Sequence, residues 1–133
     1  MASFLRAISL LCLGLYSPLH SHAAVVYVSS SVGADTNNGS LAAPLKTLTA
    51  ASNAFSATTQ SVYLLRGDQW LDEALILNQS SLAATITIGD YGNKSLPRPA
   101  IFRQRLIAAS AAAPCILYTK ASNALIQNIR LVG

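Results

Sequence analysis

The side chains best suited to acid–base chemistry lie together between positions 66 and 73. Asp68, Asp72 and Glu73 bracket Trp70. Carboxylates beside an aromatic ring can transfer protons to and from a sugar that stacks on that ring. The same residues also suit a structural turn, in which Arg66 and Asp68 hydrogen-bond to backbone groups and Trp70 packs in the core. Which interpretation holds depends on the elements that position these side chains.

A second candidate is a group of cations. Arg98, Arg103 and Arg105 lie close together in a chain whose formal net charge is +4. A basic face attracts polyanions, so these arginines are candidates for contact with an acidic glycan. The alternative, which we favour, is a solvated basic turn. The sequence contains no motif of a nucleic-acid reader, and we expect no nucleic-acid partner.

The first 23 residues have the layout of a secretory signal peptide. Met1–Arg6 supplies a short positive region, Ala7–Tyr16 an apolar run, and Ser21 and Ala23 the small residues of a cleavage site. An apolar run of roughly ten residues is too short to cross a bilayer, which needs about 20. We therefore expect a secreted or periplasmic protein that begins at Ala24 and is not held in a membrane after cleavage.

Cleavage would also remove side chains that could take part in catalysis or metal binding. It removes His20, His22 and Cys12, so the mature sequence has no histidine and Cys115 as its one cysteine. This excludes a histidine-dependent nucleophile, a zinc site of histidines and cysteines, and an intrachain disulfide within these residues. Cys115 lies in an apolar run and is expected to be a small buried side chain. Without disulfides or a metal, the remaining 110 residues are expected to depend on residues further along the chain.

The mature chain opens with a predicted strand, a loop and a short helix. The β-branched and aromatic residues of Val25–Val28 predict a strand. Turn-forming residues fill 29–40, which predicts a loop. Pro44 is expected to begin an amphipathic helix, with Leu45, Leu48 and Phe55 on one face. Such a helix suits the covering of an exposed core.

The loop matches a calcium-binding loop only in part. Asp35, Asn37 and Gly39 supply the right residue types, but an EF-hand needs glycine at its sixth position and glutamate at its twelfth. Those positions hold Ser40 and Lys46. A turn is the better interpretation.

From Ser61 onward, short apolar runs alternate with polar turns. Each run is too short for an ordinary helix, and the runs recur about every 10 to 15 residues. This recurrence predicts stacked strands, in which neighbouring coils cover one another and at least about three coils are needed. The last run ends near Gly133, where we expect more coils to follow. The runs are Val62–Leu65, Leu75–Leu77, Ile86–Ile88, Cys115–Tyr118, Leu125–Ile126 and Ile129–Leu131.

Five short motifs occur in an order that resembles the opening of bacterial secreted right-handed β-helix proteins of the pectate-lyase-like superfamily. The resemblance covers nearly all of residues 24–133. Each motif alone is weak evidence. The resemblance depends on the five motifs occurring in the same order as in that superfamily. The motifs are Tyr27-Val28-Ser29 with 33–39, Ala43–Leu48, Val62–Asp68 with Trp70, Ile86–Gly92, and Pro97–Ile101.

The resemblance implies an all-β fold: a right-handed parallel β-helix whose first coil is covered by a short amphipathic cap helix. Residues 24–133 would form the cap and first coils of a domain that is incomplete at its C-terminus. The segment 66–73 is then a structural turn, as is Asp90-Tyr91-Gly92, and Asn123 and Asn128 are candidates for stacking with asparagines of later coils. Family members include polysaccharide lyases, hydrolases, epimerases and non-catalytic adhesins.

For function, the resemblance implies a carbohydrate-active protein whose catalytic residues lie on later coils. We expect a lyase that acts on an acidic polysaccharide, with calcium possible in the full-length protein. A non-catalytic glycan-binding protein and an inactive structural remnant are the alternatives, because a shared fold does not decide function. The sequence gives no catalytic, cofactor-binding or metal-binding residue within these 133 positions.

Overall fold

The computed structural model describes residues 25–56, 59, 61–78, 85–103, 115–119 and 123–133. The predicted signal peptide and Arg105 lie outside these residues. Within the described part of the chain, no helix is long and apolar enough to cross a membrane. The elements there are nine strands and one short helix: β1 (Val25–Val28), α1 (Leu48–Ala54), β2 (Ser61–Leu65), β3 (Gln69–Leu71), β4 (Leu75–Asn78), β5 (Thr85–Tyr91), β6 (Ala100–Phe102), β7 (Ile116–Thr119), β8 (Asn123–Ile126) and β9 (Arg130–Val132).

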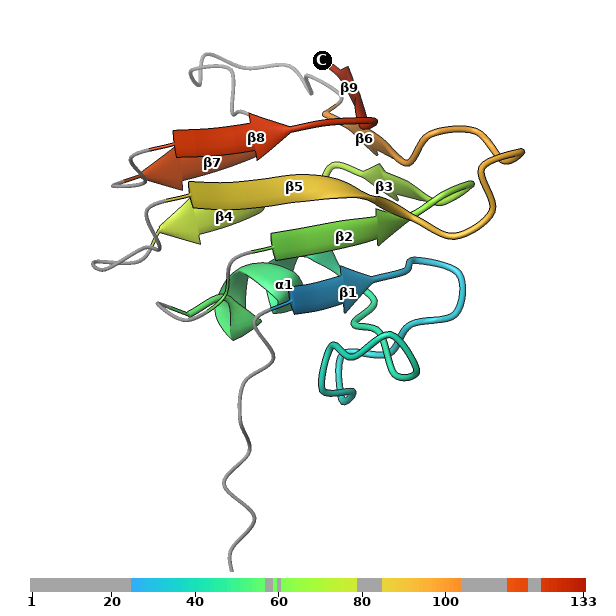
Figure 1. Cartoon of the computed structure of the whole chain (residues 1–133), viewed down its shortest axis with the longest axis horizontal. Coiled ribbons are helices and arrows are strands. Elements are labelled where there is room, and N and C mark those ends of the chain that lie inside the picture. Colours follow the sequence, from blue (N-terminus) through green and yellow to red (C-terminus); the bar gives the residue numbers. More distant parts are fainter. Residues whose placement is uncertain (1–24, 57–58, 60, 79–84, 104–114, 120–122) are drawn as a thin grey trace, which may run out of the picture.

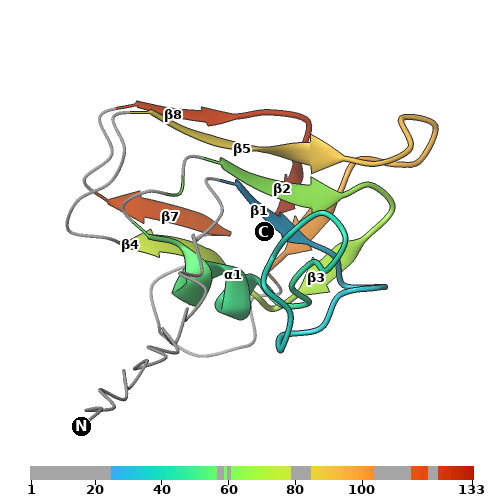
Figure 2. The same ribbon diagram turned by 60° about the horizontal axis from the view of Figure 1, so that its bottom comes forward.

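The strands form three parallel sheets that the chain visits in a repeating order (Figures 1 and 2). The first sheet has the order β1-β2-β5-β8, the second β3-β6-β9 and the third β4-β7. One passage through the sheets is β2-β3-β4, the next is β5-β6-β7, and β8-β9 begins another. Every pairing is parallel. The prediction of stacked strands with one short helix is confirmed.

Parallel register places similar side chains above one another. In the first sheet Val26 pairs with Val62, Val62 with Ile88, and Ile88 with Ile126. Successive side chains of a strand point to opposite faces, so these four residues form one inward-facing column. A second inward column comprises Trp70, Ile101 and Leu131. The buried members of these columns form the core together with other buried side chains of β1, β2, β4, β5 and α1 and with Leu45 and Phe55.

The helix α1 lies beneath the first passage of strands, against β4 and β1 (Figure 1). Leu48 and Ala51 are fully buried on its inner face. Thr47 is the N-cap residue, and its side chain accepts a hydrogen bond from the backbone N–H of Ala50 at 3.0 Å. A threonine cap satisfies one of the free N–H groups at a helix start. The helix therefore covers this end of the core, as its amphipathic pattern predicts.

The prediction that Pro44 begins the helix is wrong. Leu45 forms an isolated parallel bridge with Val28, and its backbone N–H donates to the Tyr27 carbonyl oxygen at 3.0 Å. The segment before the helix therefore pairs with β1. Because Thr47 still has extended backbone angles, the helix begins three residues later than Leu45, at Leu48.

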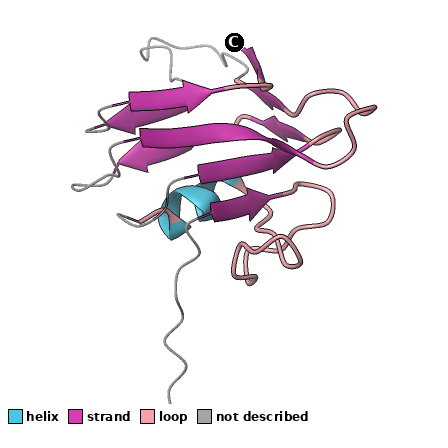
Figure 3. Cartoon of the chain, viewed as in Figure 1, coloured by secondary structure: helices cyan, strands magenta, loops and turns pink. Residues whose placement is uncertain are grey.

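The described loops that follow β1 and β5 project from the same side of the sheets (Figure 3). The loop after β1 is packed tightly against its own return segment. A Cβ atom at Gly33 would lie 2.2 Å from the carbonyl oxygen of Leu45 and 2.4 Å from that of Ser29. Backbone atoms cannot give way at such distances, so only glycine fits this position.

Two details of the strand prediction are corrected by the sheet pairing. Asp90 and Tyr91 belong to β5, because they pair with Leu64 and Leu65 of β2. Only Gly92 has the predicted left-handed backbone, with a φ of 94°. Two strands of the second sheet were missed, because β3 and β6 have three residues each, too few to show a period, whereas β9 overlaps the predicted run Ile129–Leu131.

Candidate functional site

The carboxylates that bracket Trp70 do not converge on a common site. Asp68 is buried and accepts hydrogen bonds from the Ser29 hydroxyl at 2.7 Å and the Ser31 backbone N–H at 3.3 Å. The Glu73 carboxylate accepts from the backbone N–H of Leu48 at 2.7 Å. One carboxylate therefore ties the loop after β1, and the other ties the start of α1. These contacts support the structural-turn interpretation over acid–base catalysis.

The predicted turn is shorter than 66–73, because Trp70 lies in the middle of β3 and Asp72 follows that strand. Asp72 has a φ of 57°, and its backbone N–H donates to the Phe102 carbonyl oxygen at 2.8 Å. Trp70 is 1% exposed, and its indole N–H donates to the Lys46 carbonyl oxygen at 3.0 Å. A buried ring cannot serve as a platform for a sugar. The prediction that Trp70 packs in the core is confirmed.

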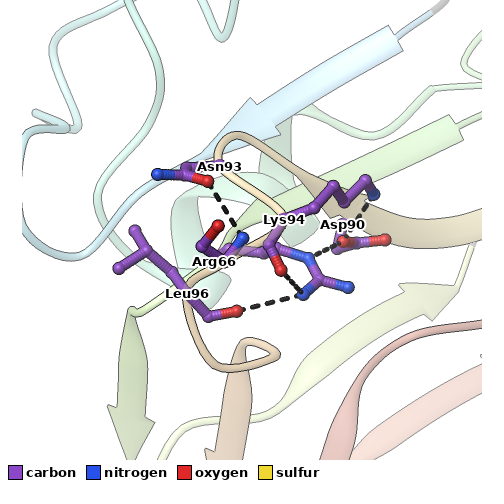
Figure 4. A network of polar contacts seen from close by, with 6 residues as sticks. Arg66, Asp90, Asn93, Lys94 and Leu96 are labelled. Carbon is purple, nitrogen blue, oxygen red and sulfur yellow. Dashed lines mark hydrogen bonds and ion pairs between the residues drawn. The ribbon is translucent and has the colours of Figure 1, made fainter.

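Asp90 is the centre of an ionic network at the end of β5 (Figure 4). It accepts from Arg66 Nε and from Lys94 Nζ, the latter at 2.9 Å. Arg66 also donates to the carbonyl oxygens of Lys94 and Leu96 at 3.1 and 3.0 Å. The network therefore fixes the loop after β5 against the loop after β2.

The same contacts set the charge of Asp90. Burial alone would raise its pKa, but hydrogen bonds from Arg66, Lys94 and Asn128 outweigh burial and lower the pKa to about 2. Asp90 is thus ionised at neutral pH and cannot act there as a proton donor. Arg66 lies in the preceding passage, Lys94 in the same passage and Asn128 in the following one, so Asp90 connects three successive layers. Asn128 hydrogen-bonds to this carboxylate; its expected stacking with asparagines of later coils stays a prediction.

A cluster of tyrosines occupies the outer face of the first sheet. The rings of Tyr27 and Tyr63 are 5.8 Å apart between centroids, and those of Tyr27 and Tyr91 are 5.1 Å apart, edge to face. Burial, and then the nearby charge of Asp68, raises the pKa of Tyr91 to about 12. The rings pack on one another and Tyr63 lies against Gly89, which leaves this cluster a packing role.

A groove of about 510 Å³ lies on the second sheet, and we call it the basic groove. Three of its strand residues share one register row, in which Gln69 pairs with Ala100 and Ala100 with Arg130, and the fourth, Leu131, belongs to the column of Trp70 and Ile101. Gln69 and Arg130 of this row are exposed, whereas Ala100 between them is buried. The full lining is Gln69, Pro97, Arg98, Ala100, Ile129, Arg130 and Leu131.

The predicted arginine group is thereby divided. Arg98 is exposed and lines the basic groove. Arg103 is partly buried and donates to the Asp72 carbonyl oxygen at 3.3 Å. Arg105 lies outside the described residues. Arg130 was not predicted as part of this group, and the parallel pairing of β9 with β6 brings it to the same groove.

The chemistry of the basic groove is that of binding. Two guanidinium groups and an amide offer hydrogen-bond donors, while the remaining lining is aliphatic. The lining includes no carboxylate, amine, imidazole or phenol that could transfer a proton. Across the described segments, no group of three or more histidine, cysteine, aspartate or glutamate residues could hold a metal ion. Cys115 is only partly buried, and its thiol lies 3.8 Å from the carbonyl oxygens of Ile101 and Val132.

Comparison with known proteins gives a partial similarity. No family model and no curated protein matches the chain. Two solved structures of GH136 lacto-N-biosidase from Eubacterium ramulus, the native protein and a selenomethionine derivative, are 34% and 33% identical to it, with TM-scores of 0.48 and 0.49. Both matches cover 59% of this chain and 13% of that chain. At these TM-scores the similarity assigns neither fold nor activity.

Proposed function

We propose that this chain is the capped N-terminal part of an exported right-handed parallel β-helix protein that acts on polysaccharides. The observation that carries the proposal is the repeated passage through three parallel sheets above a covering helix. This is the arrangement expected from the order of the five motifs. Connections between parallel strands of a sheet are right-handed in nearly all proteins, which supports the proposed hand.

The activity that we propose for the whole protein is lyase cleavage of an acidic glycan. In β-elimination a base removes the proton at C5 of a uronate, the C4–O bond breaks, and the leaving oxygen takes a proton. The products are a new end with a C4–C5 double bond and a new hydroxyl end. A cation or arginine must neutralise the uronate carboxylate while the C5 proton is removed. The basic groove offers cations of that kind but no base, so the base would lie on other coils.

A non-catalytic glycan-binding protein is the second candidate. It is favoured by one observation: the lining of the basic groove has donors and aliphatic groups but no proton-transfer group. This candidate predicts binding of glycans without turnover.

The test is an assay of the full-length protein that contains these residues. Alginate, pectate, glycosaminoglycans and neutral glycans are incubated with it, and both ultraviolet absorbance and new reducing ends are followed. Absorbance from unsaturated ends supports the lyase, whereas reducing ends without absorbance identify a hydrolase. Binding without any product supports the non-catalytic candidate. Export is tested on the secreted protein, whose N-terminus we expect to be Ala24.

A further inference from the structure

We propose that the Asn38-Gly39 pair is a deamidation site that the fold keeps inactive, and that it reacts only when the loop after β1 detaches from that strand. It is the one place in the sequence where glycine follows asparagine. Asparagine before glycine is the pair most prone to deamidation, because glycine has no Cβ to hinder attack by its backbone nitrogen. The inference concerns a chemical change of the protein itself and is independent of the proposed function.

The reaction needs water as its only co-reactant. The backbone nitrogen of Gly39 loses its proton to a solvent base and attacks the side-chain carbonyl carbon Cγ of Asn38. A bond between that nitrogen and Cγ forms, the bond between Cγ and Nδ2 breaks, and Nδ2 leaves as ammonia, which gives a succinimide ring. Water then opens the ring at either carbonyl carbon and yields aspartate or isoaspartate. In isoaspartate the backbone runs through Cβ and Cγ, so it is longer by one carbon atom.

In the folded protein the attacking nitrogen is held by a hydrogen bond. The Gly39 N–H donates to the Ala43 carbonyl oxygen at 3.0 Å, and Gly39 is buried between β1 and the return segment of the loop. Its carbonyl oxygen accepts from the Tyr27 backbone N–H at 2.8 Å. A buried, hydrogen-bonded N–H gives its proton to a solvent base far more slowly than an exposed one. Deamidation therefore requires that the loop opens first.

The side chain that is attacked is accessible. Asn38 is exposed, and its Oδ1 accepts a hydrogen bond from the Ser40 backbone N–H at 3.0 Å. A bond of this kind holds the asparagine side chain against the backbone of the residues that follow it. The protection against deamidation therefore comes from the buried nitrogen of Gly39, and not from burial of the Asn38 amide.

The isoaspartate product would not pair with β1 as the parent loop does. The Gly39 carbonyl oxygen and the Leu45 backbone N–H hold the loop on the N–H and C=O of Tyr27, at 2.8 and 3.0 Å. Val26 and Leu45 fill the space at Gly39, since a Cβ atom there would lie 3.4 and 3.6 Å from their side chains. A longer backbone before Gly39 therefore moves its N–H away from Ala43 or its C=O away from Tyr27. Opening of the loop becomes permanent once isoaspartate has formed.

The experiment follows deamidation of Asn38 in the full-length protein at mildly alkaline pH, by peptide mapping with mass spectrometry. A synthetic peptide of residues 34–43 gives the rate of the unprotected pair. The folded protein is expected to react at least about tenfold more slowly than the peptide, because opening of paired backbone costs free energy. Leu45→Ala removes a buried side chain that packs on Gly39, so it should open the loop more often and raise the rate severalfold. Leu41→Ala, in the same loop but 60% exposed, is the matched control and should leave the rate unchanged.

Circular dichroism verifies that each variant is folded, and Asn37→Ala replaces Leu45→Ala if the latter is not. Asn37→Ala removes the hydrogen bond of 2.9 Å from Asn37 Nδ2 to the Pro44 carbonyl oxygen, and its rate is compared with that of a peptide carrying the same change. A folded parent that deamidates as fast as the peptide would overturn the proposal. An equal rise of the rate in Leu41→Ala and Leu45→Ala would overturn it as well.

Hydrogen exchange at the Tyr27 amide tests the effect of the product, because this amide is bonded to the Gly39 carbonyl oxygen only while the loop is paired. Asn38→Asp is the control, since it adds the same charge without lengthening the backbone. Faster exchange in the isoaspartate form than in Asn38→Asp supports the permanent loss of pairing, and equal exchange contradicts it.

Discussion

At the α1 end of the molecule, which we call the closed end, Val26 is 4% exposed and Leu48 is fully buried. At the β8–β9 end, the open end, Ile126 and Leu131 occupy the same inward columns but are 39% and 46% exposed. The residue types are alike, so the difference comes from what lies over them. A helix of seven residues is sufficient to bury one end of the columns, and each inner layer is buried by the next.

The largest expected effect tests this contrast within one column. Trp70→Ala should destabilise the fold by about 4 kcal/mol, because it removes a buried ring and leaves a cavity. Leu131→Ala, in the same column but 46% exposed in this structure, should cost less than Trp70→Ala. Urea-induced unfolding measures both. Equal losses of stability would contradict the difference in burial between the layers. Ile101→Ala, at a fully buried position, should cost more stability than Leu131→Ala.

The next effect concerns the connection between layers through Asp90. Its pKa is lowered from 3.8 to about 2, so its contribution is complete above about pH 4 and is lost as the pH falls through about 2. The shift corresponds to a contribution of about 2 kcal/mol. Stability measured from pH 5 to pH 2 should therefore fall less in Asp90→Asn than in the parent.

Two further variants compare the partners of Asp90 in the preceding and the following passage of strands. Arg66→Gln removes the larger hydrogen-bond contribution and should raise the pKa of Asp90 more than Asn128→Ala does. NMR titration of the Asp90 carboxyl carbon measures both shifts. A larger rise in Asn128→Ala would mean that the layer nearer the open end holds this carboxylate.

The smallest effect lies at the closed end, where Thr47 begins α1. Thr47→Ala removes the cap on the Ala50 N–H and the hydrogen bond to Asp35 at 2.9 Å. The expected loss is about 1 kcal/mol. Thr49→Ala is the control, because Thr49 is exposed within the same helix and alanine is the better helix former. Thermal unfolding should show a lower Tm for the first variant only.

The difference between local sequence pattern and long-range contacts explains which elements could be predicted from the sequence. Runs such as Val62–Leu65 and Ile86–Ile88 have local patterns strong enough to predict strands. The three-residue strands β3 and β6 have no such pattern, because their stability comes from neighbours distant in the sequence. The start of α1 was misplaced for the same reason: the bridge between Leu45 and Val28 overrides the preference of Pro44 for a helix start.

The candidate site was predicted only in part. Arg98 was singled out from its position among other arginines, and the carboxylates near Trp70 were favoured as structural groups, which agrees with the contacts of Asp68 and Glu73 on either side of β3. Arg130 could not be connected with Arg98 without the parallel pairing of β6 and β9. Ligand binding at the basic groove depends on which residues lie side by side in neighbouring strands. The spacing of those residues along the chain does not show this pairing.

Trp70 gives this molecule an optical probe of its own. It is the single tryptophan of the chain, it is almost fully buried, and its indole N–H is bonded to the Lys46 carbonyl oxygen just before α1. Detachment of the helix would break that bond and admit water to the ring, which would move the fluorescence emission to longer wavelength. Emission therefore reports the docking of the helix, whereas far-ultraviolet circular dichroism reports the sheets, and a difference between the two would reveal a state in which the closed end has opened while the strands stay paired.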